Sequence, residues 1–173
     1  PFKIGEVIVS GDIVTAEYYQ MEEQTKKAKI MDEKGKLWHR MGDVGYLDQD
    51  GKLWFCGRKT HRVHVDTTQN DGQQKKELYS IPCEAVFNEH PEVKRTALIQ
   101  TSEKGLNTAS IVIERRDKKS LRGKEKHRFE KEILLIAKNF EHTSSIKKVY
   151  YHNNFPVDVR HNIKIDRIKL REV

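Results

Sequence analysis

The sequence predicts an α+β fold, with a part rich in β-hairpins followed by a small sheet packed with helices. Three observations predict it. Two apolar runs flank an Asp-Gly turn at residues 48–51, which is a strong hairpin signal because glycine adopts the positive φ that such turns need. Several short runs are rich in β-branched residues, as strands are. One apolar stripe at helical spacing marks residues 124–140.

The first 65 residues predict mainly strands. Residues 4–11 are rich in β-branched residues and end at a glycine, which is typical of a strand. Residues 22–29 predict a short helix. The arms of the hairpin lie on either side of residues 48–51. Val63 and Val65 alternate with polar neighbours, which predicts a further strand with both valines on one face.

The remaining residues alternate between helices and strands. Pro82 suits the first turn of a helix that ends at His90-Pro91. Strands are expected at residues 93–100, 108–114 and 146–152, and a polar loop at residues 66–77, where apolar residues show no periodicity. The helix at residues 124–140 should bury the stripe formed by Phe129, Ile133, Ile136 and Phe140.

The composition argues against several classes of protein. No apolar run is long enough to span a membrane, no signal peptide precedes the first strand, and we expect a cytoplasmic protein. Cys56 and Cys83 are too few for a disulfide framework and are expected to be reduced, buried thiols. The net charge of +7 raises nucleic acid as a partner. Because acids separate the basic residues and no aromatic residues interleave them, solvated surfaces are favoured and no nucleic acid is expected.

The hairpin predicts a polar site at its open end. Pairing its arms brings Gly42-Asp43 next to Gly57-Arg58, where glycine lets backbone approach a ligand closely. A carboxylate accepts hydrogen bonds from neighbouring hydroxyls, and a guanidinium holds ribose or phosphate oxygens. His61 and His64 do not predict a metal site, because residues three apart on a strand point to opposite faces.

The ordered set Gly42-Asp43, Gly45-Tyr46-Leu47-Asp48, Asp50-Gly51-Lys52-Leu53, Phe55 and Gly57-Arg58 resembles the adenylate-forming superfamily of acyl-CoA synthetases, adenylation domains and luciferases. The resemblance implies that Asp43 binds the ribose hydroxyls of ATP and that Arg58 contacts ribose or phosphate oxygens. It also implies Mg²⁺ with the ATP, although its ligands are not evident in this chain.

The resemblance divides the chain into three parts. Residues 1–58 correspond to the β-rich end of a large N-terminal AMP-binding domain, and residues 61–173 to a small C-terminal lid domain. Lys59-Thr60 is the implied hinge about which the lid rotates between two half-reactions. Thr60 stands where the family usually has Asp or Lys. A hinge needs only to absorb a backbone rotation, so threonine is compatible with that role.

The tail resembles the terminal motif of the superfamily, in which a lysine follows a proline and precedes a hydrophobic residue. Lys164-Ile165-Asp166-Arg167 fits it, although Ile163 replaces the usual glycine and the interval after Pro156 is two residues longer. The resemblance implies that Lys164 is catalytic. Its long stem and point charge suit a cation that meets a carboxylate and an α-phosphate together. The alternative is a solvated surface lysine.

Within the superfamily, the stretches around residues 39–48, 53–59, 79–91 and 155–165 look most like the olefin-biosynthesis β-lactone synthetases, often labelled fatty acyl-CoA ligases or peptide synthases. The implied reaction activates a 2-alkyl-3-hydroxy fatty acid with ATP and closes a β-lactone. A fatty acyl-CoA or acyl-AMP ligase, or a peptide-synthetase-type adenylation enzyme, is the alternative. In acyl-CoA synthetases the matching stretch is short and helps line the pantetheine tunnel, so the longer polar insert at residues 66–77 weighs against CoA as a substrate. The alternative is that this insert is a tolerated surface loop. A non-enzymatic basic binding module is the distant alternative.

One expected element is absent from the sequence. No Ser/Thr/Gly-rich phosphate loop of the family occurs in these 173 residues. The chain therefore resembles a C-terminal part of a larger enzyme, and alone it is expected to be inactive. The small-molecule carboxylic acid would bind the whole protein, and the sequence does not predict an oligomeric state.

Overall fold

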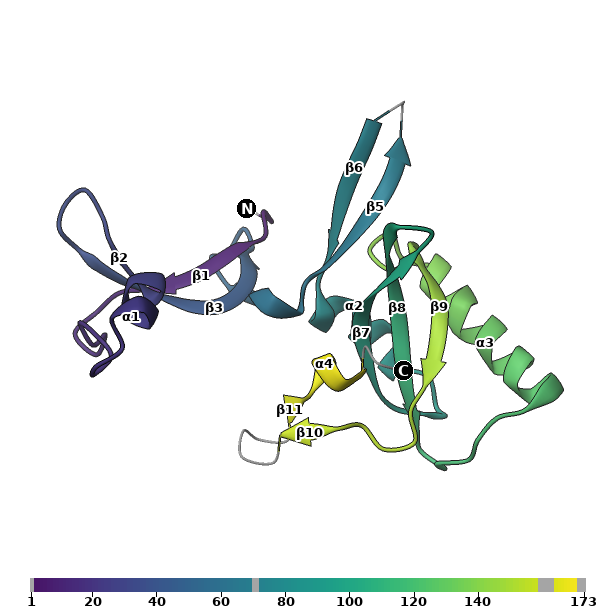
Figure 1. The fold of residues 1–173 in the computed structure, drawn as a ribbon. Helices are drawn as coiled ribbons and strands as arrows, with labels where there is room; N and C mark the ends of the chain where they lie inside the picture. Colours follow the sequence, from purple (N-terminus) through teal and green to yellow (C-terminus); the bar gives the residue numbers. More distant parts are fainter. Residues whose placement is uncertain (1, 70–71, 159–163, 171–173) are drawn as a thin grey trace. The chain divides into compact units, whose positions relative to one another are not determined.

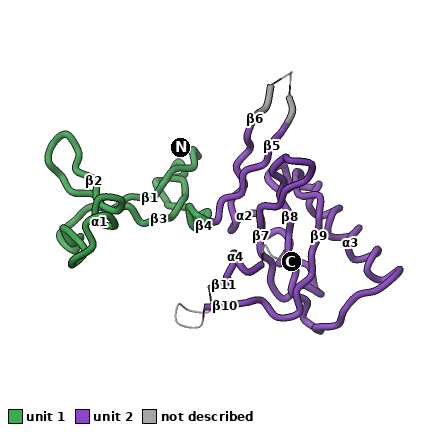
Figure 2. Tube along the Cα trace, viewed as in Figure 1, with its two compact units in different colours: residues 1–60 green, residues 61–173 purple. Residues whose placement is uncertain are grey.

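The computed structural model describes residues 2–69, 72–158 and 164–170. It has an α+β fold, as predicted, with four helices and eleven strands among those residues (Figure 1). The chain divides into two compact units, residues 1–60 and residues 61–173 (Figure 2). The hinge role expected for residues 59–60, next to this division, stays a prediction. No helix in the described part of the chain is long and apolar enough to cross a membrane.

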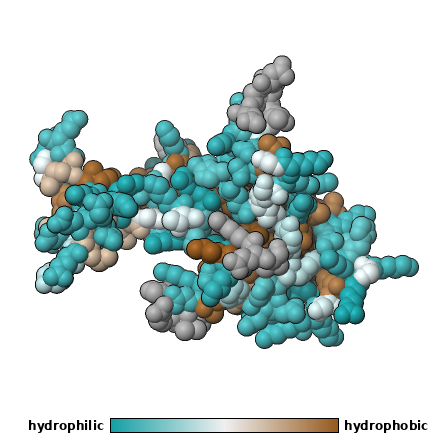
Figure 3. Space-filling model, viewed as in Figure 1, coloured by the Kyte–Doolittle hydropathy of each residue, from teal (hydrophilic) through white to brown (hydrophobic). Residues whose placement is uncertain are grey.

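Unit 1 is built around one long strand, β3 (Leu37–Leu47). Three other strands pair with it, all antiparallel. They are β1 (Gly5–Val9), β2 (Lys29–Met31) and β4 (Leu53–Arg58). Helix α1 (Glu22–Ala28) precedes β2 as expected. Of the described hydrophobic residues in this unit, Val44 and Cys56 are buried. Unit 1 therefore has a thin core, and Figure 3 shows hydrophobic side chains at its surface.

Two turns of the same design flank β3, and one of them was predicted from the sequence. Residues 32–38 and 48–54 share the pattern Asp-x-x-Gly-Lys-Leu-Trp. In the second turn, Asp48 Oδ1 accepts the backbone N–H groups of Asp50 and Lys52, and Oδ2 accepts Trp54 Nε1–H at 2.7 Å. In the first, Asp32 makes the equivalent bonds, including one of 2.9 Å from Trp38. In each turn the aspartate carboxylate thus accepts hydrogen bonds from backbone N–H groups that would otherwise bind water.

These bonds lower the pKa of each aspartate, and the indole donor is the largest cause. We expect Trp54→Phe to raise the pKa of Asp48 towards its usual value, because the ionised carboxylate loses a donor. Carboxyl carbon NMR titration measures this directly. Trp38→Phe is the matched control and should move Asp32 alone. Because the pKa is lowered, the turn's contribution to stability is present at neutral pH and is lost as pH falls through that lowered pKa.

Unit 2 contains a three-stranded sheet in the order β7-β8-β9. Strands β7 (Val93–Glu103) and β8 (Leu106–Arg115) are antiparallel, and β9 (Ile146–Tyr151) runs parallel to β8 at the edge. Helices α2 (Ser80–Asn88) and α3 (Gly123–Lys138) contribute to one core with this sheet. The strands expected at residues 93–100, 108–114 and 146–152 are thereby confirmed. Cys83 is buried in this core, and both cysteines are free, as predicted.

Two expectations for unit 2 are wrong. Residues 66–77 are not a loop, because β5 (Val63–Gln69) pairs with β6 (Gly72–Leu78) as a hairpin. Its outer part is polar on both faces, so it lacks the alternation that marks a half-buried strand. Phe140 does not belong to the apolar stripe, since α3 ends at Lys138 and Phe140 is 46% exposed. Ala137 is buried at the helix end instead.

Candidate active site

The first part of the site is an acidic and a basic side chain at the open end of the β3–β4 hairpin. Asp43 and Arg58 are paired across the strands, and Arg58 Nη1 donates to Asp43 Oδ1 at 2.7 Å. The sequence prediction that these two residues lie together is confirmed. The same Nη1 also donates to the carbonyl oxygen of Met41. No described residue donates a hydrogen bond to Asp43 Oδ2.

The backbone around this pair is shaped by glycine and by an irregular register. Gly42 and Gly57 have φ values of 67° and 125°, which L side chains rarely adopt. The register of β3 and β4 shifts between Val44 and Gly45. Such a shift bends the strand and increases its local twist. At Gly45 the two strands lie so close that a Cβ atom would sit 2.5 Å from the carbonyl oxygen of Trp54.

We expect Gly45→Ala to destabilise unit 1 by about 1–3 kcal/mol, since the backbone must move to admit the methyl group. Both tryptophans of the chain, Trp38 and Trp54, lie in unit 1, so their fluorescence during urea unfolding reports on this unit. Gly5→Ala is the control. Gly5 faces Gly45 across the strands, yet a Cβ atom there would meet nothing within 4 Å. Equal unfolding midpoints for the two variants would contradict the prediction.

An ion-pair cluster holds the residue that precedes the predicted pivot. Lys59 begins a short 3-10 helix (Lys59–His61), and its Nζ lies 2.7 Å from Glu6 Oε2 on β1. Arg40 also binds the Glu6 carboxylate, through Nε and Nη2. The bonds from Arg40 first, and then from Lys59, lower the pKa of Glu6. The side chain of Lys59 is thus tied to unit 1, and Thr60 is the last residue of that unit.

The second part of the site is Lys164, in unit 2. It begins β11 (Lys164–Ile165), which pairs antiparallel with β10 (Val157–Asp158). The side chain of Lys164 is exposed and has no ion pair with any residue that the structure describes. The backbone N–H of Asp166 donates to the Pro156 carbonyl oxygen at 2.8 Å, which extends the pairing of β10 and β11 by one hydrogen bond. Ile163, which replaces the family glycine, lies outside the described residues.

A buried ion pair anchors the segment that carries Lys164. Arg167, the first residue of α4 (Arg167–Leu170), binds both carboxylate oxygens of Glu84 on α2, at 2.6 and 3.1 Å. Its Nη1 also donates to the carbonyl oxygen of Leu98, whose N–H donates to Glu84. Burial raises the pKa of the Glu84 carboxyl, and the Arg167 guanidinium opposes that shift.

Two further contacts fix the same segment. Leu170 is fully buried in a second hydrophobic cluster with Ala97, Ile99, Val112 and Phe155. Asp166 Oδ1 accepts the backbone N–H groups of Ile168 and Lys169, the second and third residues of α4. Lys164 is therefore an exposed cation on an anchored support. Because the support fixes the backbone of this lysine, less conformational freedom remains to be lost when its side chain contacts a ligand.

The ion pair between Glu84 and Arg167 was not predicted from the sequence. The two residues are 83 positions apart, so no local pattern connects them. One signal was present, a single glutamate inside the apolar run Pro82 to Phe87. A carboxylate there must find a buried partner. The structure brings Asp43 and Arg58 together in unit 1. It places Lys164 in unit 2, on the two-stranded sheet formed by β10 and β11.

The described residues contain no group of three or more His, Cys, Asp and Glu side chains that could hold a metal ion. His64 Nδ1 instead lies 3.7 Å from Glu77 Oε1.

Comparison with known proteins decides the family. The chain is 37% identical over 172 residues, or 97% of its length, to olefin beta-lactone synthetase of Xanthomonas campestris pv. campestris. It has the same identity over 175 residues to the olefin beta-lactone synthetase of Stenotrophomonas maltophilia. A solved structure of o-succinylbenzoate CoA synthetase from Bacillus subtilis, in complex with its acyl-adenylate intermediate, covers all of the chain with a TM-score of 0.73 at 19% identity. The chain belongs to the adenylate-forming enzyme superfamily.

A second solved structure shares the fold of the chain. An ATP-bound chimera named RpMatB-BxBclM covers 99% of the chain with a TM-score of 0.77 and 20% identity. No family model matches the chain. The chain spans 29% of the length of each curated relative named above, and 31% of each solved structure. It therefore corresponds to less than one third of the length of these proteins.

Proposed function

We propose that the whole protein activates a 2-alkyl-3-hydroxy fatty acid with ATP and closes it to a β-lactone. The observation that carries this proposal is the 37% identity to two olefin beta-lactone synthetases over 97% of the chain. In the first step, a carboxylate oxygen attacks the α-phosphorus of ATP and pyrophosphate leaves. In the second, the oxygen of the 3-hydroxyl attacks the activated acyl carbon, the hydroxyl loses its proton, and AMP leaves.

Asp43 and Arg58 are the nucleotide-binding residues in this proposal. The Oδ2 atom of Asp43 accepts a ribose hydroxyl, while Oδ1 stays with Arg58. Arg58 is half exposed, and donors of its guanidinium that do not contact Asp43 can bind a ribose or phosphate oxygen. The pair is held by strand pairing and by a 2.7 Å bond, which preorganises both groups before ATP arrives.

Lys164 is the catalytic residue in this proposal. Its cation stabilises the negative charge that develops as the carboxylate meets the α-phosphate. Because the charge stabilised is that of the transition state, the lysine raises the rate of adenylation more than the affinity for ATP. Lys59-Thr60 is the hinge that brings Lys164 to the nucleotide. Mg²⁺ accompanies ATP, and none of the steps assigned to the described residues depends on it.

An acyl-CoA ligase is the second candidate. It is favoured by a match to 2-succinylbenzoate–CoA ligase of Geobacillus kaustophilus, 34% identical over 57% of the chain. An intramolecular hydroxyl needs no CoA, and the β5–β6 hairpin occupies the stretch where the resemblance expects a short loop lining the pantetheine tunnel. We therefore favour the β-lactone.

The test uses the whole protein with ATP, Mg²⁺ and a 2-alkyl-3-hydroxy fatty acid, with and without CoA, and identifies products by mass spectrometry. A β-lactone and AMP formed equally in both arms is the expected result. An acyl-CoA thioester in place of the lactone would support adenylation of the acid but contradict lactone formation. The 173-residue chain alone should release no pyrophosphate, because the family's phosphate loop is absent from it.

A further inference from the structure

The positive charge of the chain is concentrated in one segment to which the proposed reaction gives no role. Residues 115–128 contain eight Lys or Arg residues and two acids, so they carry +6 of the net +7. The segment begins at the end of β8, continues through residues 116–122 and forms the first turns of α3. These 14 residues lie in unit 2.

This basic segment borders a cavity of about 570 Å³ next to the edge strand β9. Its apolar wall consists of Ile113, Leu121 and Val149. Its polar lining includes three cationic side chains, two tyrosines and a histidine, namely Arg115, Lys119, Lys126, Tyr150, Tyr151 and His152. None of the described residues that line it is acidic. A cavity with an apolar wall and cations fits an anion that carries an organic group.

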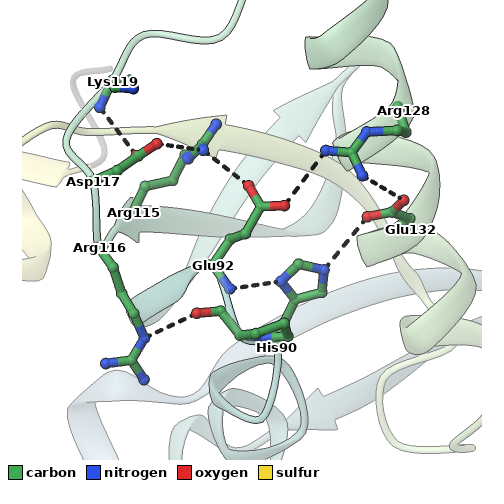
Figure 4. Close-up of polar contacts among 9 residues, drawn as sticks. His90, Glu92, Arg115, Arg116, Asp117, Lys119, Arg128 and Glu132 are labelled. Atoms are coloured by element: carbon green, nitrogen blue, oxygen red, sulfur yellow. Dashed lines mark hydrogen bonds and ion pairs between the residues drawn. The ribbon is translucent and has the colours of Figure 1, made fainter.

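Arg115 has more hydrogen-bonding capacity than its protein partners use. It is 7% exposed, and its Nη2 lies 2.8 Å from both Glu92 and Asp117. Figure 4 shows Glu92 between the guanidinium groups of Arg115 and Arg128. The Nε and Nη1 atoms of Arg115 are buried and have no hydrogen-bond partner among the described residues. An unsatisfied buried donor costs free energy, so a ligand acceptor there would be stabilising.

Tyr151 adds a second unpartnered donor. Its hydroxyl is buried and lacks a hydrogen-bond partner within the described residues. Burial raises the pKa of Tyr151, with a smaller contribution from Glu130, so the group stays a neutral O–H donor at physiological pH. Lys126 Nζ lies 5.6 Å above the Tyr151 ring and 3.7 Å from Glu130. The loose ion pair leaves Lys126 able to turn towards a stronger anion.

The N-terminus of α3 adds to the positive charge of the cationic side chains that line the cavity. Its N-cap residue is Arg122, which makes no side-chain cap bond, so the first backbone N–H groups are not capped by that side chain. The N-terminus of a 16-residue helix adds partial positive charge beside the cavity. A purely structural role for Arg115 accounts for its bonds to Glu92 and Asp117 and for the position of its guanidinium over the Phe129 ring, 5.3 Å from the ring centroid. It does not account for the cavity and the clustered charge.

We propose that this cavity binds a small molecule that carries a phosphate group. The organic part of the ligand would lie against the apolar wall, and the phosphate oxygens would accept from the cations and the neutral tyrosine. Nucleic acid is disfavoured, because the segment does not alternate its cations with exposed aromatic side chains that stack on bases. The site does not use Asp43, Arg58 or Lys164, so it stands independently of the proposed reaction.

The test is an amide NMR titration of the 173-residue chain with pyrophosphate, with AMP, and with sulfate, at constant ionic strength. Pyrophosphate represents a free phosphate product, and AMP a phosphate with an organic group. The pocket variant combines Lys119→Ser with Lys126→Ser. The matched control combines Lys131→Ser with Lys138→Ser, which removes the same charge from α3 at a different cavity.

We expect saturable shifts at Ser120, Leu121, Tyr151 and His152, with binding weakened about tenfold in the pocket variant and less than about twofold in the control. Stronger binding of AMP than of pyrophosphate would identify an organic phosphate as the ligand class. The reverse order would contradict the role given to the apolar wall. Shifts confined to unit 1, equal weakening in both variants, equal binding of sulfate, or no saturation by either phosphate would overturn the proposal. Lys164→Ala should leave these shifts unchanged.

Discussion

Replacing Lys164 with alanine in the whole protein should lower the rate of carboxylate adenylation by about 10²–10³-fold, the loss typical of removing one preorganised donor of charge stabilisation. The KM for ATP should change little, because the lysine acts on charge that appears in the transition state. Since Lys164 is exposed and its support is held by other residues, the variant should fold normally. Single-turnover measurement of AMP formation tests this.

Lys169→Ala is the matched control for that experiment. Lys169 is exposed on the same anchored segment, five residues further along, and its Nζ lies 3.5 Å from Asp166. Its removal should leave the rate of adenylation within about twofold, as surface ion pairs contribute little. Similar losses in both variants would mean that the general charge of the segment matters, and that Lys164 has no special role.

Arg167→Ala should destabilise unit 2 by about 3–5 kcal/mol, because it leaves the buried Glu84 carboxylate without its partner. Both side chains of the pair are about one tenth exposed, so water does not replace the lost bonds. Hydrogen exchange of the backbone amides in β7 and β8 measures the stability of this unit separately from unit 1. Faster exchange throughout these two strands is the expected result.

The double variant Glu84→Leu with Arg167→Met separates the ion pair from the space that it fills. A buried pair replaced by apolar residues of similar size is often neutral or stabilising. Exchange in β7 and β8 should therefore return close to the wild-type rate. Adenylation should stay slower than in the wild-type protein if the pair also positions Lys164. A rate of adenylation fully restored in the double variant would limit the pair to a role in stability.

The sequence predicted elements whose signals are local. The turn at Asp48 to Gly51 and the pairing of Asp43 with Arg58 follow from the position of a glycine and from strand geometry. The buried positions Phe129 and Ile133 follow from helical spacing. Each of these needs information from at most about 20 neighbouring residues, which a periodicity argument can use.

The remaining features depend on contacts that no local pattern contains. The β5–β6 hairpin was missed because residues 66–77 include no apolar residue, so the sequence shows no alternation there. The Glu84–Arg167 pair joins residues 83 positions apart. The turn at Asp32 was missed for a different reason. Its repeat of the pattern at Asp48 was visible in the sequence, and comparison of the two stretches would have predicted it. Phe140 was misassigned because helical spacing does not mark the residue at which a helix ends.

The central claim is that this chain belongs to a protein that activates a carboxylic acid as an adenylate. ATP–pyrophosphate exchange by the whole protein tests it most directly, since labelled pyrophosphate enters ATP only if adenylation is reversible on the enzyme. We predict exchange that requires a 2-alkyl-3-hydroxy fatty acid, needs no CoA and is lost in Lys164→Ala but not in Lys169→Ala. Absence of exchange with every carboxylic acid offered, from a correctly folded whole protein, would contradict the account.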